Sequence, residues 1–220
     1  SDEEARRAYA SLDDLRGVLS PVYFSTDPDT RRVVRGLGGL PRQEDVTKPL
    51  LFVGNHQALA LDIGLLVGEM RMQRGVLMRG LAHPVLFGQD GSVARSIPGM
   101  PSSEEETTDN IFRKFGAVPV SSRNAFKLLV SGDNVLLFPG GLKETMPRSG
   151  DPYALLWPDK SEFVRLAAKV NATIVPFGGV GAAELLSVVA DVDQVDAVKD
   201  SPIRTFLPDW IEAFGTRPDA

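Results

Sequence analysis

The sequence predicts an α/β fold: a single domain in which helices flank a central, partly parallel mixed sheet. Short apolar runs of the kind that form buried strands recur along the chain, and longer amphipathic segments typical of helices lie between them. The clearest strand is Leu50 to Val53, and the clearest amphipathic helix is Ser161 to Val170. The length agrees, because 220 residues make one ordinary domain with a sizeable core.

The composition is that of a globular protein, with 43% hydrophobic and 24% charged residues. A net charge of −5 argues against a nucleic-acid partner and against a purely electrostatic anchor on anionic lipid. The absence of cysteine excludes disulfides, thiolate metal sites and cysteine nucleophiles. Two histidines at unrelated spacing predict no metal site, so we expect neither a metal nor a bound cofactor. No apolar run approaches the ~18 residues that a membrane span requires.

Residues 1–45 are expected to lead into the domain through helices and a hairpin. Ser1 to Leu19 is typical of one or two short helices. Two short strands, Pro21 to Ser25 and Arg32 to Arg35, flank the turn residues Asp27-Pro28-Asp29, which predicts the hairpin. The N-terminus has neither a starting Met nor an apolar signal core, so we expect a processed or trimmed chain.

Residues 46–185 are predicted to form the core of the domain, and residues 186–220 an acidic helical segment where the domain is expected to be truncated or altered. His83 to Pro101 is rich in Gly, Pro and Ser, which predicts a long surface segment of the kind that is usually functional. The strands predicted after Leu50 to Val53 are 76–78, 117–120, 135–138 and 173–177, and the helices are 63–70, 103–114, one capped by Ser122 and stopped by Gly132, and 161–170.

The end of the strand Leu50 to Val53 carries the first candidate for catalysis. Gly54 and Asn55 break the strand, and His56 follows at the edge where open α/β sheets bind ligands. Asp62 comes six residues later, about 600° of helix, so the two side chains meet only if His56 lies on the loop and Asp62 in the first helical turn. There the carboxylate would hold one imidazole nitrogen and leave the other as a general base. Taken alone, His56 is more often a buried structural histidine.

Three further motifs follow this pair in a fixed order. Each has an ordinary explanation when taken alone, as an exposed residue or a plain turn, and only their combination carries weight. They are Phe115 to Asn124, with Arg123 after a short strand; Leu136 to Glu144, with Pro139-Gly140-Gly141 at the end of a strand; and Ile174 to Gly181, with Pro176 near the end of a strand.

The four motifs together resemble blocks one to four of the PlsC-like glycerolipid acyltransferase superfamily, over about residues 50 to 181. The superfamily more commonly has His-x4-Asp, and the longer spacing here resembles the plant and algal branch that includes phytyl ester synthase and its diacylglycerol acyltransferase relatives. In block three most members read Phe-Pro-Glu-Gly-Thr, whereas this chain has Gly140 for the Glu and Leu142 for the Thr, with Glu144 as its acidic residue. Block four departs too, since Ala182-Ala183 stand where the branch usually carries two acids.

The resemblance implies a set of site residues. His56 and Asp62 would be catalytic, and Asn55 would shape the loop or polarise the substrate carbonyl. The oxyanion needs hydrogen-bond donors, and backbone N–H groups near Gly140 and Gly141 are candidates. The residues expected to bind substrate are Asn55, Arg123, Pro139, Gly140, Gly141, Glu144 and Pro176.

The predicted activity is transfer of a fatty acyl group from acyl-CoA or acyl carrier protein to the hydroxyl of a lipid alcohol. The missing phosphate-site pattern argues against lysophosphatidic acid and favours a neutral acceptor such as diacylglycerol or phytol. The resemblance also implies a plastid location and contact with a membrane or lipid-droplet surface through His83 to Pro101. Two alternatives stay open: a non-catalytic lipid-binding or scaffold subunit that keeps the fold, and a hydrolase that uses water at the same histidine. The sequence does not indicate the oligomeric state.

Overall fold

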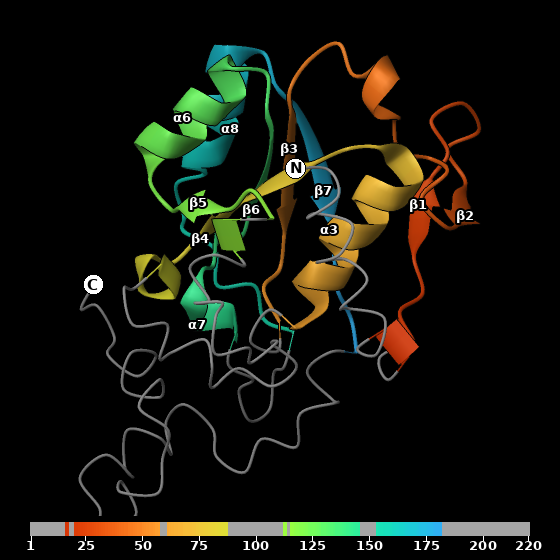
Figure 1. Ribbon diagram of the computed structural model, residues 1–220, viewed down its shortest axis with the longest axis horizontal. Helices are drawn as coiled ribbons and strands as arrows, with labels where there is room; N and C mark the ends of the chain where they lie inside the picture. The colour runs from red at the N-terminus through yellow and green to blue at the C-terminus, as the bar shows by residue number, and fades with distance from the viewer. Residues whose placement is uncertain are drawn as a thin grey trace, which may run out of the picture.

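The computed structural model describes residues 16–17, 20–57, 61–87, 112–113, 115–145 and 153–181, without the side chains of 61, 62, 85, 86 and 142. Its main feature is a five-stranded sheet in the order β5-β4-β6-β3-β7 (Figure 1). Every pairing within this sheet is parallel, so the α/β class is confirmed while the expected mixed sheet is parallel throughout its described strands. The strands are β3 (Leu50–Gly54), β4 (Met78–Ala82), β5 (Val118–Pro119), β6 (Asn134–Leu137) and β7 (Thr173–Phe177).

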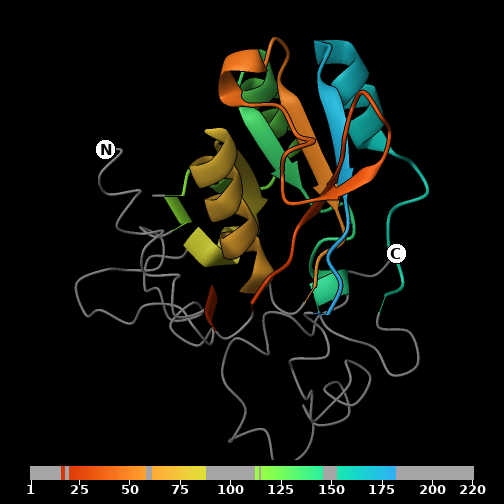
Figure 2. The same cartoon turned by 90° about the vertical axis from the view of Figure 1, so that its right-hand side faces the viewer.

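Helices cover both faces of the sheet. Helix α3 (Leu61–Arg74) lies on one face, and α6 (Ser122–Val130) and α8 (Glu162–Val170) lie on the other (Figure 2). The alternation along β3 matches this arrangement, because successive side chains of a strand point to opposite faces. Leu50 and Phe52 belong to the core cluster that includes residues of α3, whereas Leu51 and Val53 belong to the cluster that includes residues of α6 and α8.

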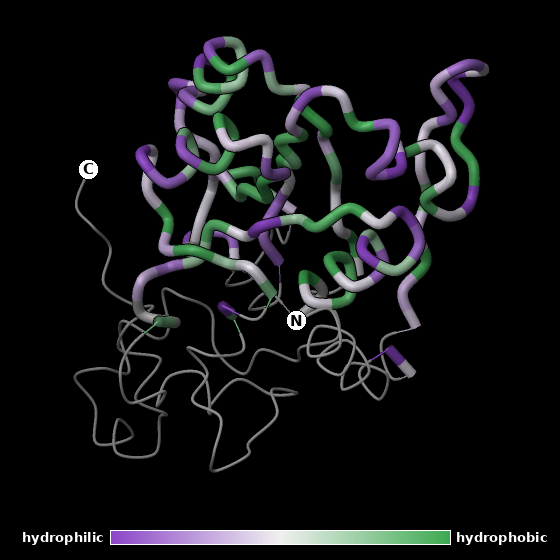
Figure 3. Tube along the Cα trace, turned by 45° about the horizontal axis from the view of Figure 1, so that its top comes forward, coloured by the Kyte–Doolittle hydropathy of each residue, from purple (hydrophilic) through white to green (hydrophobic). Residues whose placement is uncertain are grey.

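Burial on both faces explains why β3 is an unbroken apolar run. All five of its residues are buried, as expected for a central strand of a parallel sheet. Figure 3 shows the same distribution along the chain, with hydrophobic stretches through the layered core and hydrophilic stretches at the outer turns and the hairpin. Among the described helices none is both long enough and apolar enough to cross a bilayer.

The predicted hairpin is confirmed. Strands β1 (Phe24–Thr26) and β2 (Val33–Arg35) pair antiparallel beside the main sheet. Asp27 holds the turn, because one of its carboxylate oxygens accepts hydrogen bonds from the N–H groups of Asp29 and Thr30 and from the Thr30 hydroxyl. The Thr30 N–H, and next its hydroxyl, lower the pKa of the Asp27 carboxyl below its ordinary value. This is the Asx-type turn chemistry that the sequence indicated.

Most other predicted elements lie within a residue or two of the observed ones, and two differ for clear reasons. The strand predicted at 76–78 is β4, which begins at Met78 and continues through the polar Arg79. The cap of α6 is Ser121 rather than Ser122, since Ser121 has extended backbone angles and its hydroxyl accepts the Asn124 N–H. Three short helical elements are η1 (Gln43–Asp45), η3 (Pro84–Phe87) and α7 (Leu142–Thr145).

Several predictions fall outside the described residues. They are the helices before residue 16, almost all of the helix at 103–114, most of the surface segment from His83 to Pro101, and the acidic segment 186–220. The proposed boundaries at 45 and 185 stay predictions.

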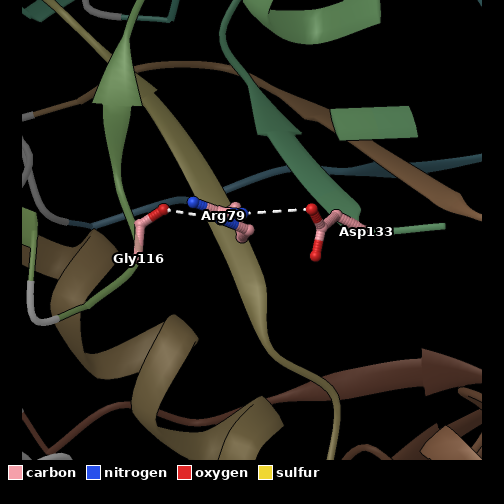
Figure 4. A network of polar contacts seen from close by, with 3 residues as sticks. All are labelled: Arg79, Gly116 and Asp133. Carbon is pink, nitrogen blue, oxygen red and sulfur yellow. Dashed lines mark hydrogen bonds and ion pairs between the residues drawn. The ribbon is translucent and has the colours of Figure 1, made fainter. Parts of the chain in front are cut away.

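Arg79 is a charged residue inside the sheet, and it joins the two neighbours of β4 (Figure 4). Its Nε donates to the carbonyl oxygen of Gly116, two residues before β5, at 3.0 Å. Its Nη1 donates to the carboxylate of Asp133, just before β6, at 3.0 Å. The guanidinium thereby satisfies groups on both sides of β4, which explains why a charged residue continues the strand.

We expect Arg79 and Asp133 to be energetically coupled. In a double-mutant cycle with Arg79→Met and Asp133→Ala, measured by urea unfolding, the coupling should be about 1 kcal/mol, because both side chains are only about one-third exposed. The control is the more exposed pair Arg165 and Glu162 on α8, for which about 0.3 kcal/mol is expected. Equal coupling in the two pairs would contradict the structural role of Arg79.

Candidate active site

The candidate site lies at the carboxyl ends of three adjacent strands. β3 ends at Gly54 and leads into His56, β6 ends just before Phe138, and β7 ends at Phe177. Because β6 and β7 flank β3 and all three run parallel, their ends lie at the same edge of the sheet, at the bottom of Figure 1. This is the edge where open parallel sheets bind their ligands, as the sequence predicted for His56.

His56 packs its ring on an aromatic pair. Its ring centroid is 4.4 Å from that of Phe138, and the Phe138 ring in turn meets the Phe177 ring edge-on at 5.8 Å. The residue as a whole is half-buried, but Nδ1 is fully enclosed and has no hydrogen-bond partner in the described part of the chain. Burial lowers the pKa of His56 to about 4. The imidazole is therefore neutral near pH 7, which is the form that accepts a proton.

The backbone geometry required for a His56–Asp62 pair is present. His56 lies on the loop after β3, and Asp62 is the second residue of α3, hence in its first turn. The Asp62 side chain lies outside the described part of the structure, so the dyad itself stays a prediction.

Asn55 fastens the end of β3 to the end of β7. Its side-chain Nδ2 donates to the Gly179 carbonyl oxygen at 2.9 Å, and its Oδ1 accepts the Gly179 N–H at 2.7 Å. Of the two roles expected for Asn55, the structure shows the shaping of the loop. Both ends of the amide are used in this contact, and a contact between Asn55 and substrate stays a prediction.

Glu144 joins the third motif to the first. One of its carboxylate oxygens accepts the backbone N–H of His56 at 3.1 Å, and the other accepts the backbone N–H of Leu156 at 2.7 Å. The carboxylate passes over Gly140, where a Cβ would clash with it. Gly54 makes room in the same way, because a Cβ there would enter the Phe177 ring. Both glycines are therefore set by close approach of another side chain.

Of the two glycine N–H groups in the turn after β6, one has no partner among the described residues. Gly141 adopts φ +55°, and its N–H donates to the Phe138 carbonyl oxygen at 3.0 Å. The N–H of Gly140 makes no hydrogen bond to any described residue. Of the two N–H groups expected near the oxyanion, Gly140 is the one that remains available. Pro139 lies in the same turn.

Arg123 and Pro176 make none of the contacts described above, and only Arg123 lies on a distant strand connection. Arg123 is exposed in the first turn of α6, which follows β5. Strands β4 and β6 separate β5 from β3, so at ~4.8 Å per strand the two strands are about 14 Å apart. Pro176 is an exposed residue on β7, at the edge of the described sheet, paired in register with Val53. An edge strand is where a proline is tolerated.

The sequence reasoning missed Gln57. This residue is 4% exposed, and neither its Oε1 nor its Nε2 has a hydrogen-bond partner in the part of the chain that the structure describes. A buried amide without partners is costly and requires an explanation, such as a water or a ligand. Its place directly after His56 was the signal available in the sequence.

The described residues contain no group of three acidic, histidine or cysteine side chains that would hold a metal ion.

Comparison with known proteins supports the resemblance seen in the motifs. The chain is 39% identical over 181 residues to phytyl ester synthase 1, chloroplastic, of Arabidopsis thaliana, and 41% identical over 185 residues to phytyl ester synthase 2, chloroplastic, of the same plant. It is similar to the plant phytyl ester synthases. Each match takes in 82% of this chain but 24% of the relative, so the chain spans about a quarter of the length of these curated relatives.

The wider superfamily receives no such support. No protein-family model matches the chain, and no solved structure matches it. The similarity supports the phytyl ester synthase branch, and membership of the PlsC-like superfamily stays a prediction.

His56 should make the stability of the protein depend on pH. Its pKa is about 4 when folded and 6.5 in the unfolded chain, so the unfolded state binds more protons between these values. The contribution of His56 to the free energy of unfolding is complete above pH 6.5. It falls as the pH drops toward 4, by up to about 3 kcal/mol. In His56→Gln, urea unfolding at pH 7 and pH 4.5 should show this loss reduced. His83→Gln, at an exposed position, should keep the loss seen in the parent, and an equal loss in His56→Gln would contradict the buried neutral imidazole.

Gln57 should tolerate loss of its amide. Gln57→Leu removes no hydrogen bond to a described residue and replaces a buried amide that lacks partners among them, so the free energy of unfolding should stay the same or rise by about 1 kcal/mol. The matched control is Asn134, equally buried at 4%, whose amide accepts the Leu50 N–H and donates to Gln43. Asn134→Leu should lose about 2 kcal/mol. Similar losses in both variants would mean that Gln57 is bonded in the folded protein.

Proposed function

We propose that this chain carries the acyl-transfer site of an enzyme that esterifies a lipid alcohol, with phytol the first candidate acceptor and diacylglycerol the second. The donor would be acyl-CoA or acyl carrier protein. The observation that carries the proposal is the His56 ring at the carboxyl edge of the sheet, neutral, with an enclosed Nδ1 that no described residue pairs. The similarity to phytyl ester synthases supplies the reaction class and the acceptor. The names of these relatives also support a plastid location, and contact with a membrane or lipid-droplet surface belongs to the same proposal.

The proposed mechanism needs one base and no covalent enzyme intermediate. Asp62 accepts the Nδ1–H of His56 and keeps Nε2 free, which explains how the enclosed Nδ1 becomes satisfied. Nε2 takes the proton of the acceptor hydroxyl as that oxygen attacks the thioester carbonyl carbon. When the tetrahedral intermediate collapses, the C–S bond breaks and the imidazolium returns the proton to the departing thiolate. The products are an ester and a free thiol.

Two groups are proposed to hold polar atoms of the substrates. The Gly140 N–H is directed to the oxyanion, because the neighbouring N–H of Gly141 is already used within the turn. The buried Gln57 amide would bond to a substrate oxygen, since a ligand would satisfy groups that the described residues leave unpaired. The remote position of Arg123 fits a neutral acceptor, which needs no guanidinium beside the base.

A non-catalytic lipid-binding or scaffold role is the second candidate. It is favoured by the contacts of Asn55 and Glu144, whose polar side-chain atoms are committed to backbone groups. Against it stands the unpaired His56 Nδ1, because a purely structural histidine is normally hydrogen-bonded when it is enclosed.

The test is acyl transfer from radiolabelled acyl-CoA and acyl carrier protein to phytol, diacylglycerol and lysophosphatidic acid in parallel. We expect a phytyl ester, and a rate lower by about 100-fold or more in His56→Ala, since general base catalysis contributes 10²–10⁴-fold. Glu162→Gln, at an exposed position on α8, is the control and should keep the parent rate. Folding of each variant is checked by circular dichroism.

The other outcomes separate the alternatives. Release of free fatty acid without any acceptor, abolished in His56→Ala, would identify a hydrolase. No product with any acceptor from the folded chain would favour the scaffold role. Product only with lysophosphatidic acid would overturn the choice of a neutral alcohol.

A further inference from the structure

The position of His56 depends on a residue from a distant part of the chain. We propose that Glu144 is a positioning residue, which sets the place of the His56 imidazole by holding its backbone and by joining it to the segment 153–157. The inference rests on the proposed function, because it assigns Glu144 to the base of that reaction.

Both oxygens of the carboxylate are used, and each is used by a different segment. The His56 N–H donates to one at 3.1 Å and the Leu156 N–H donates to the other at 2.7 Å. Hydrogen bonds to an ionised acceptor are stronger than neutral ones. In the described part of the chain Glu144 forms no ion pair with a cation, so these two N–H groups are its partners there.

The chain is built to bring this carboxylate into place. Gly141 adopts φ +55° directly before α7, and α7 places the side chain of Glu144 over Gly140. Gly140 is buried, and a Cβ there would collide with the Glu144 side chain. The absence of a side chain at Gly140 therefore leaves the space that the Glu144 side chain occupies.

The same loop holds His56 from two sides. Phe138, which precedes the turn, lies against the imidazole at 4.4 Å, while Glu144, which follows it, holds the backbone N–H. The preceding residue, Asn55, is fixed separately by Gly179. Loss of Glu144 thus removes one of the contacts that fix the histidine and leaves the others, so the fold is retained while the ring gains freedom.

The hydrogen bond from the Leu156 N–H to Glu144 extends the connection toward α8. Leu156 lies in the segment 153–157, where Tyr153 Oη accepts the Gly181 N–H at 3.1 Å and Trp157 meets Phe163 of α8 edge-on. Glu144 therefore connects the base to a segment that is held in two other places. A misplacement of about 1 Å in a catalytic group lowers rates by about 100-fold.

The experiment compares Glu144→Ala, Glu144→Gln and Gly140→Ala with the parent, and uses Glu162→Gln as control because Glu162 is exposed on α8. We expect kcat to fall about 100-fold in Glu144→Ala and about 10-fold in Glu144→Gln, which keeps one acceptor oxygen, while KM for acyl-CoA changes less than about 3-fold. Gly140→Ala should resemble Glu144→Ala. When Gly140→Ala is added to Glu144→Ala, kcat should fall little further, because the Glu144 side chain that the new methyl group would displace is already absent.

A second readout does not depend on activity. The chain has 2 histidines, so the imidazole signals in ¹H–¹⁵N spectra are assigned by His83→Gln. The His56 ring signals should shift or broaden in Glu144→Ala and Gly140→Ala, whereas those of His83 stay in place. Unchanged His56 signals in folded Glu144→Ala, or an unchanged kcat per folded molecule, would overturn the positioning role.

The two proposals fail in different ways. If the parent transfers no acyl group but the His56 signals move in Glu144→Ala, the positioning role stands and the proposed reaction is wrong. If the parent is active and Glu144→Ala matches it in kcat and in the His56 signals, the reaction stands and the positioning role is wrong.

Discussion

The burial of β3 on both faces is the constraint on which the site depends. All five residues of this strand are buried, and it forms ladders with β6 on one side and β7 on the other. Val53 is paired on both sides and Gly54 with Phe177, so the end of the strand cannot move without disturbing these pairings. The contacts of Asn55 with Gly179 and of the His56 N–H with Glu144 carry this rigidity two residues beyond the strand. A catalytic side chain needs such support, because it acts only within a narrow range of positions.

The enclosure that fixes the imidazole also fixes its charge. The Phe138 ring, itself packed on Phe177, lies against His56, and burial of the imidazole lowers its pKa. The same enclosure leaves His56 Nδ1 and the Gln57 amide unpaired among the described residues. Folded proteins carry such unfavourable groups chiefly at functional sites, where a ligand or a partner side chain satisfies them. Two of them on adjacent residues at the ligand edge of the sheet support a binding or catalytic role over a purely structural one.

Features that depend on neighbouring residues were predictable from the sequence, and features that depend on distant ones were not. The turn at Asp27 and the limits of α8 and β7 follow from local chemistry and periodicity, and the structure agrees. The contact of Glu144 with His56 joins residues 88 positions apart, which no local pattern encodes. The extension of β4 through Arg79 is also a tertiary effect, since its guanidinium is satisfied by groups next to two other strands. Arg123 lies apart from the base because strand order, not sequence spacing, places β5 at the far edge.

The structure gives a physical meaning to the departure in the third motif. Most PlsC-like enzymes read Glu where this chain has Gly140, whereas the Pro-Gly-Gly form here resembles the phytyl ester synthase branch. A side chain at position 140 would enter the space that the Glu144 carboxylate occupies. In this chain the acidic residue stands four positions later, on α7, and the glycine leaves room for its side chain. Gly140 and Glu144 therefore depend on each other in this chain, because a side chain at position 140 would displace the carboxylate that accepts the His56 N–H. The altered third motif by itself is therefore no reason to regard the site as inactive. The case for a scaffold rests on the departure in the fourth motif and on the commitment of Asn55 and Glu144 to backbone groups.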